Sequence, residues 1–179
     1  MTGGYLSAWW TAKDVELVTV AAETRYKNAR KAHARALRGI QSEDMLPRDM
    51  EGCMGELMFN RVMEFSEEFT PYHPTEPDSN GWEVKSSKTW PNMLVPNDIL
   101  VYQHRPICRV RLIMKDRLAI VGGWCFIRDV PTLSYKPAPD REGKGYPDGF
   151  LVAQTALMSI VPLQGVHGEE VFKRHWLDL

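Results

Sequence analysis

A two-residue turn signal followed at once by a strand pattern constrains the fold of this chain more than any other feature. Asn80-Gly81 is a strong signal for a hairpin turn, and the residues after it, Trp82 to Lys88, are typical of a strand. Side chains alternate faces along a strand. One face therefore carries an apolar pair that can enter a core, and the other carries Glu83 and Lys85, which we expect to meet solvent or a substrate.

The acidic residue just before this turn gives the stretch a chemical meaning. The turn can fold Asp78 back beside Glu83, and two carboxylates with a few waters suit Mg²⁺, which prefers hard oxygen ligands. The backbone carbonyl of Val84 is a natural additional ligand. A bound metal polarises a phosphoryl oxygen and acidifies a water. Lys85 can orient that water and stabilise negative charge, or act as a base if burial lowers its pKa.

The N-terminal part of the chain predicts one long helix, from Ala12 to Leu37. This stretch contains no Gly or Pro and is rich in Ala, Arg, Lys and Glu, which favour helices. Thr11 can cap the helix, with Asp14 three residues on, as in a variant of the capping box. We expect Gly39 to end it.

The second half of this helix is strongly basic. No acidic residue occurs from Thr24 to Arg38, and Lys27, Lys31 and Arg35 recur every four residues, so they share one helix face. Two interpretations stay open. The face is either a solvated outer surface or a surface that contacts the phosphates of a nucleic acid.

A second helix is predicted from Met50 to Phe65, with Asp49 as its N-cap. Gly52 and Gly55 weaken this helix by about 1 kcal/mol each relative to Ala. Such glycines often mark the close approach of another backbone, and we expect one here.

The rest of the chain predicts strands and turns. A break is expected at Pro91, and a Pro/Gly-rich charged loop from Ser134 to Gly149. The predicted strands are Ile99 to Gln103, a hairpin of Arg109 to Met114 and Leu118 to Trp124 that turns at Lys115-Asp116-Arg117, and a short strand near Phe150 to Ala153, followed by a helical turn or a second strand. Three basic loop residues either clamp DNA or are solvated: Lys136, Arg141 and Lys144.

Length and composition limit the class of protein. A chain of 179 residues fits one domain with a real core. The net charge of −1 argues against a surface that is basic all over, so any positive charge toward nucleic acid must be local. Three widely spaced cysteines favour a reducing compartment, and the histidines lack zinc-ligand spacing. Without a signal-peptide pattern or a membrane-length apolar run, we expect a cytoplasmic protein with no membrane partner.

Pro77-Asp78 followed by Glu83-Val84-Lys85 resembles the motif of the PD-(D/E)XK nuclease superfamily. In that family the Asp and the Glu bind a divalent metal, and the Lys serves the attacking water. Many members add a Glu from the preceding helix, for which Glu56 is the matching residue here. The resemblance implies an α/β (α+β) protein with a restriction-endonuclease-like core, a central mixed β-sheet flanked by helices. The whole chain would form one domain, with the core at 49–163 and an added basic N-terminal helix at 12–38.

The likeness extends to small phage-encoded proteins of this superfamily, in which Gly123-Trp124 and the segment Ala153 to Leu157 are expected features. The Gln-x-x-x-Tyr element of the RecB-like exonuclease branch is absent, and Tyr102-Gln103 is no substitute for it. No amphipathic crossover helix follows the Glu-Val-Lys strand, so we expect the later strands to be mostly antiparallel. The resemblance thus implies an endonuclease or a resolvase-like enzyme rather than a RecB-type exonuclease.

These observations predict a Mg²⁺-dependent nuclease that acts on DNA, with Mn²⁺ able to substitute. The predicted catalytic set is Glu56, Asp78, Glu83 and Lys85, and the predicted metal ligands are Glu56, Asp78, Glu83 and Val84. The predicted nucleic-acid contacts are Lys27, Lys31, Arg35, Ser87 and Lys88. Two alternatives stay open: a non-catalytic nucleic-acid-binding module on the same fold, and a protein-interaction role in which the basic helix docks an acidic partner. A homodimer is left open, and the compartment would be the host cytoplasm if the chain is phage-encoded.

Overall fold

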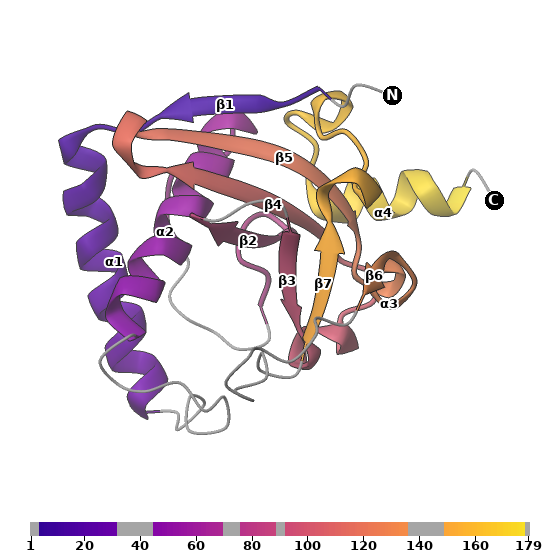
Figure 1. Ribbon diagram of the computed structural model, residues 1–179, viewed down its shortest axis with the longest axis horizontal. Helices are drawn as coiled ribbons and strands as arrows, with labels where there is room; N and C mark the ends of the chain where they lie inside the picture. Colours follow the sequence, from indigo (N-terminus) through magenta and orange to yellow (C-terminus); the bar gives the residue numbers. More distant parts are fainter. Residues whose placement is uncertain (1–3, 32–44, 70–75, 89–91, 136–148, 178–179) are drawn as a thin grey trace.

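Helix α1 (Ala12–Lys31) begins where the sequence predicts, at a capping box. The backbone N–H of Thr11 donates to Asp14 Oδ2 at 2.6 Å, and the N–H of Asp14 donates to Thr11 Oγ1 at 3.3 Å. This exchange satisfies backbone donors that the first helical turn leaves without partners. The computed structural model describes residues 4–31, 45–69, 76–88, 92–135 and 149–177 (Figure 1). The predicted end of the helix, at Gly39, lies outside these residues.

Helix α2 (Met45–Val62) begins before the predicted start, so the prediction of Asp49 as its cap is wrong. Pro47 lies in the first turn, where a missing N–H costs little because no helical acceptor exists for it. The helix also ends before Phe65. Glu64 adopts a left-handed conformation (φ 60°), and the Phe65 N–H donates to the Asn60 carbonyl at 2.9 Å. This is a Schellman-type C-cap.

The main sheet is mixed, as predicted. Its strand order is β1-β5-β4-β2. The bounds are β1 (Leu6–Trp9), β2 (Glu83–Ser87), β4 (Pro106–Ile113) and β5 (Leu118–Phe126). Strands β2 and β4 are parallel, and every other described pair of strands is antiparallel, which confirms the mostly antiparallel prediction. The β4–β5 hairpin turns at the predicted place, through a short 3-10 helix (Met114–Asp116) and a left-handed Arg117.

A smaller sheet packs on the other side, with the order β3-β7-β6. Its strands are β3 (Asn92–Pro96), β6 (Ser134–Tyr135) and β7 (Gly149–Ala153). Strand β7 and the helical turn after it (Gln154–Ala156) confirm the favoured prediction for this segment. The predicted strand from Ile99 to Gln103 is wrong, because Pro96 ends β3 and residues Asn97–Val101 form a 3-10 helix. No α-helix lies between β2 and β4 in the part of the chain described.

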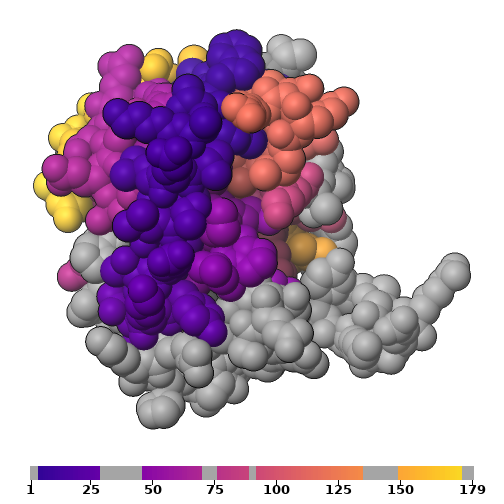
Figure 2. All heavy atoms as spheres, turned by 90° about the vertical axis from the view of Figure 1, so that its left-hand side faces the viewer, coloured from indigo at the N-terminus to yellow at the C-terminus, as the bar shows by residue number. Residues whose placement is uncertain are grey.

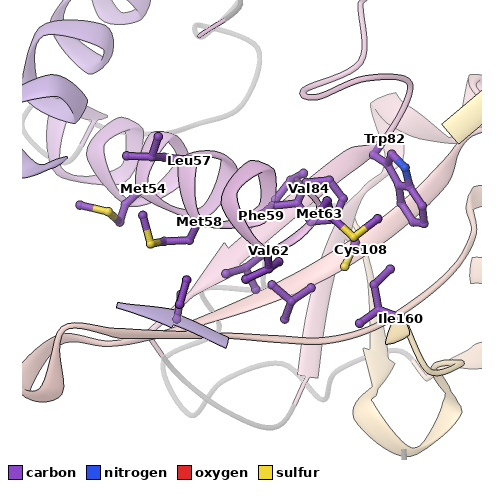
Figure 3. Close-up of a cluster of buried hydrophobic side chains, with 14 of the residues drawn as sticks. Met54, Leu57, Met58, Phe59, Val62, Met63, Trp82, Val84, Cys108 and Ile160 are labelled. Carbon is purple, nitrogen blue, oxygen red and sulfur yellow. The ribbon is translucent and has the colours of Figure 1, made fainter. Parts of the chain in front are cut away.

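Two apolar clusters hold these layers together. The larger lies between α1, α2 and the main sheet, and includes the fully buried Leu57, Phe59 and Trp82 (Figure 3). The smaller lies between the two sheets, where Ile107 and Cys125 of the main sheet meet the residues of β3 and β7. The chain is thus a mixed α+β structure with helices over one face of its main sheet (Figure 1).

No helix or strand was predicted after the helical turn that follows β7. The C-terminal part comprises a 3-10 helix (Val161–Leu163) and α4 (Gly168–Leu177), and a further short helical segment, Ile127–Asp129 with α3 (Val130–Leu133), follows β5. Helix α4 abuts the hairpin that precedes β2: the Gly168 N–H donates to the Asn80 carbonyl at 3.0 Å. Within the described ranges, no helix combines the length and apolar character needed to cross a bilayer.

Candidate active site

The turn before β2 folds Asp78 back onto the strand, as the sequence predicts. Ser79 and Trp82 exchange two backbone hydrogen bonds, at 3.0 and 2.7 Å, around Asn80 and Gly81. Both central residues have positive φ (44° and 86°), which is the geometry of a type I′ turn. The hairpin therefore sets Asp78 beside β2.

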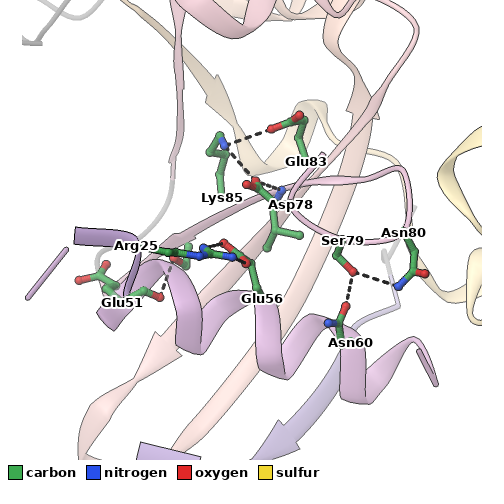
Figure 4. Close-up of polar contacts among 11 residues, drawn as sticks. Arg25, Glu51, Glu56, Asn60, Asp78, Ser79, Asn80, Glu83 and Lys85 are labelled. Atoms are coloured by element: carbon green, nitrogen blue, oxygen red, sulfur yellow. Dashed lines mark hydrogen bonds and ion pairs between the residues drawn. The ribbon is translucent and has the colours of Figure 1, made fainter. Parts of the chain in front are cut away.

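Asp78 and Glu83 lie on either side of the Lys85 ammonium group (Figure 4). Lys85 Nζ is 3.3 Å from Asp78 Oδ2 and 3.5 Å from Glu83 Oε2. The same oxygen of Asp78 accepts the N–H of Val84 at 2.8 Å, which fixes the carboxylate against the strand. Three residues of the predicted set thus meet in space.

Glu83 is more buried than expected. Its side chain is only 6% exposed, against 24% for Lys85, so of the two residues expected to meet solvent or a substrate only Lys85 has appreciable contact with solvent. It is paired with Arg105, whose Nη1 donates to Glu83 Oε1 at 2.8 Å and whose guanidinium lies over the Tyr102 ring. Sequence reasoning missed Arg105, since it stands in a turn before β4 with no motif around it.

Glu56 reaches the same region from α2. Gly55 allows the helix to approach β2 closely, because a Cβ there would lie 2.4 Å from the Cβ of Ser86. The predicted close approach is confirmed at Gly55 and is wrong at Gly52, where nothing lies within 4 Å. The Glu56 side chain is 7% exposed and accepts two hydrogen bonds, both at 2.5 Å, from the guanidinium of Arg25 on α1.

The pKa values show that these carboxylates share one electrostatic environment. Burial, and then the negative charge of Asp78, raise the pKa of Glu56 to about 7, despite the Arg25 pair. The same two causes raise the pKa of Glu83. A carboxyl group whose pKa is raised by like charge gains from a nearby cation. This is the electrostatic character expected of a cation-binding or catalytic site.

Lys85 is held in its charged form. Burial lowers its pKa, but the negative charges of Asp78 and Glu83 outweigh burial and raise the pKa above its usual value. The condition for Lys85 to act as a base, a lowered pKa, is therefore not met in this arrangement. Lys85 can instead donate hydrogen bonds and stabilise negative charge.

The candidate metal ligands are of the kind that Mg²⁺ prefers, although their carboxylates are already paired with basic side chains. Asp78 and Glu83 offer hard carboxylate oxygens. The N–H of Val84 points away from β4, toward Asp78. Because the carbonyl of a strand residue points to the same edge as its N–H, the Val84 carbonyl lies at this edge as well. Among the described residues, no three acidic, His or Cys side chains converge as metal ligands do, since Lys85 stands between two carboxylates and Arg25 binds the third.

Asn60 anchors the hairpin and was not predicted. It lies one helical turn after Glu56 on α2, so the two face the same way. The Ser79 hydroxyl donates to its side-chain oxygen (Figure 4). The hairpin is also held at Trp82, whose indole N–H donates to the Val166 carbonyl at 3.0 Å. The helical spacing from Glu56 was the one sequence signal that could have indicated Asn60.

The predicted nucleic-acid contacts are only partly placed. Lys27 is well exposed on α1, which runs along one face of the molecule (Figure 2). It is two residues, or about 200°, around the helix from Arg25, so it faces away from Glu56. The side chain of Lys31 and all of Arg35 lie outside the described residues, as do the loop lysines and arginine at 136, 141 and 144.

The strand-end residues are close to the site but paired. Ser87 ends β2. Lys88 follows it, and its ammonium lies 3.2 Å from Glu51 Oε2, while its backbone N–H donates to the other oxygen of that carboxylate at 3.0 Å. These bonds tie the end of β2 to α2, and the half-exposed Lys88 ammonium keeps donors that could contact a phosphate.

A scan against protein-family models, a search of curated proteins and a search of solved structures each found no match. What the site can do therefore follows from its own geometry and charges.

Proposed function

We propose that this protein is a divalent-metal-dependent nuclease that hydrolyses phosphodiester bonds in DNA. One observation carries the proposal: a type I′ hairpin sets Asp78 and Glu83 at 3.3 and 3.5 Å on either side of the Lys85 ammonium. The order of these residues resembles the PD-(D/E)XK motif, and a mixed sheet with helices on one face is compatible with the restriction-endonuclease-like core which that resemblance implies.

The site residues would have two roles, as ligands of the metal and as a cation beside it. Asp78, Glu83 and the Val84 carbonyl would hold Mg²⁺ or Mn²⁺, and Glu56 would join them once it leaves Arg25. The metal would polarise the phosphoryl group and acidify water. Lys85, which is charged here, would orient the attacking water and stabilise the negative charge that develops on phosphate.

Arg105 acts through Glu83 and is a positioning residue. Its bond to Oε1 leaves Oε2 directed toward Lys85, the side from which a metal would be bound. Partners of this kind fix the orientation of metal-ligating carboxylates. In an endonuclease of this design, Arg105 would set metal affinity without touching the substrate.

A second candidate is a non-catalytic nucleic-acid-binding module on the same fold. The observation that favours it is that Lys85, Arg25 and Arg105 already neutralise the three carboxylates through ion pairs. A network balanced in this way can be structural. Such a module would bind DNA and leave it intact.

The test is incubation of plasmid, linear and branched DNA with the protein and Mg²⁺ or Mn²⁺. We expect cleavage by the wild type, and a loss of about 100-fold or more in Lys85→Ala, which removes a stabiliser of transition-state charge. Lys13→Ala, an exposed lysine at the start of α1, is the matched control and should retain activity.

Three other outcomes would count against the proposal. Cleavage that survives Lys85→Ala contradicts the assigned site. DNA that is bound but never cut by the wild type supports the non-catalytic module. Failure to retard DNA or RNA at low salt contradicts both and points to a protein-interaction role.

A further inference from the structure

Each carboxylate of the candidate site is paired with a cation among the described residues. The four ion pairs are Arg25–Glu56, Lys85–Asp78, Lys85–Glu83 and Arg105–Glu83. A divalent cation that enters this cluster adds two positive charges. A phosphodiester and a deprotonated water, each with one negative charge, offset them.

Arg25 is the cation whose geometry suits an exchange of partners. It grips Glu56 with both Nη atoms, one on each carboxylate oxygen. A phosphate presents the same two-oxygen edge to a guanidinium as a carboxylate does. Burial lowers the pKa of Arg25, but the bond to Glu56 and, more weakly, the charge of Asp78 raise it, so the guanidinium lies in the electrostatic field of a carboxylate that would hold the metal.

We propose that Arg25 is a substrate-binding residue that exchanges Glu56 for a DNA phosphate when Glu56 turns to the metal. This inference rests on the proposed nuclease function. The Arg25 side chain is 13% exposed, and a guanidinium that buried loses two charge-assisted hydrogen bonds if Glu56 leaves and nothing replaces it. Release of Glu56 and capture of a phosphate are therefore expected together, so that metal and DNA each increase the affinity for the other.

The competing interpretation is that Arg25 only neutralises Glu56 and ties α1 to α2. Both interpretations predict that the pair stabilises the metal-free protein. They differ in what happens to DNA binding. A purely structural pair contributes nothing to the affinity for DNA, with or without metal.

The first experiment measures binding with Ca²⁺, a hard cation, on the full chain. Ca²⁺ affinity is measured by calorimetry, and affinity for a short fluorescent DNA duplex by anisotropy, with the duplex checked for integrity on a gel. We expect Arg25→Met to bind Ca²⁺ more tightly than the wild type, since Glu56 has no partner to leave. Its DNA affinity in Ca²⁺ should fall by about tenfold or more, the usual loss for a charged hydrogen-bond donor, while its metal-free DNA affinity stays unchanged.

Two more variants isolate the guanidinium fork. Arg25→Lys keeps the charge and loses the bidentate geometry, so the gain in DNA affinity caused by Ca²⁺ should shrink. Lys13→Met removes a positive charge from the same helix, far from Glu56, and should behave as the wild type. If Arg25→Met matches Lys13→Met in both Ca²⁺ and DNA affinity, Arg25 is structural and the inference is wrong.

A second measurement avoids the risk that Arg25→Met fails to fold. Glu56→Gln leaves Arg25 in place but loosens its partner, so metal-free DNA affinity should rise several-fold, and Arg25→Met/Glu56→Gln should abolish that rise. An unchanged affinity in Glu56→Gln overturns the inference. A wild type that neither binds metal nor cleaves DNA overturns the proposed function itself, whereas a wild type that does both without any effect of Arg25 overturns this inference alone.

Discussion

Replacing Gly55 with Ala tests how closely α2 must approach β2 to build the site. The added Cβ would lie 2.4 Å from Ser86 Cβ and 2.9 Å from its Oγ, well inside ordinary van der Waals contact. Since Ser86 Cβ is fixed to the strand backbone, helix and strand must move apart. Overpacking of this kind costs about 1–3 kcal/mol.

Gly52 in the same helix is the matched control. Its Cβ would meet nothing within 4 Å, so Gly52→Ala should stabilise the protein by about 1 kcal/mol through helix propensity. That gain applies equally to Gly55→Ala. The difference in unfolding free energy between the two variants is therefore the steric cost itself, about 1–3 kcal/mol.

The assay is urea unfolding followed by circular dichroism, with equal m-values required for both variants. Ser86→Gly, which removes the opposing Cβ, should recover much of the loss when combined with Gly55→Ala, even though it removes the 2.9 Å bond from Ser86 Oγ to the Glu51 carbonyl. Cleavage should fall in Gly55→Ala alone, because Glu56 and Lys85 are displaced from each other. Equal stabilities for Gly55→Ala and Gly52→Ala would show that α2 and β2 have room for a Cβ at position 55.

Three further predictions concern other contacts. Arg61 lowers the pKa of Asp14 to about 2, from 3.8, so Asp14 should contribute about 2 kcal/mol of stability above pH 4 that is lost as the pH falls toward 2. Urea unfolding across this range should show the loss in the wild type and not in Asp14→Asn. Gly168→Ala would place a Cβ 2.3 Å from a carbonyl oxygen of the hairpin. It should destabilise the protein by about 1–3 kcal/mol in the same assay and reduce cleavage. Arg105→Met should weaken metal binding by about 10–100-fold in calorimetry, since the glutamate it orients is then unsupported; an unchanged affinity would remove its positioning role.

Local features of the fold could be predicted from the sequence because their causes are local. The Thr11–Asp14 capping box, the Asn80-Gly81 turn and the β4–β5 hairpin each depend on residues within a few positions of one another. The same holds for Asp78 beside Glu83, which a two-residue turn alone can arrange. These are the features that the structure confirms.

What the sequence could not indicate depends on contacts between distant segments. Strand β1 pairs with β5 more than a hundred residues later, and α4 is held by the hairpin at Asn80. Arg25 and Arg105 lie 31 and 22 residues from the glutamates they bind, with no periodicity linking them. The ion pair that Glu83 makes with Arg105 is one such contact, and the alternation of the strand does not indicate it.

The most direct test of the site is a crystal structure of the protein soaked in Mn²⁺, with the metal located by its anomalous scattering. We expect a peak within coordination distance of Asp78, Glu83 and the Val84 carbonyl, with the Lys85 ammonium moved out from between the two carboxylates. Mn²⁺ bound elsewhere, or an ammonium that stays between the carboxylates while the same protein cleaves DNA, would contradict this expectation.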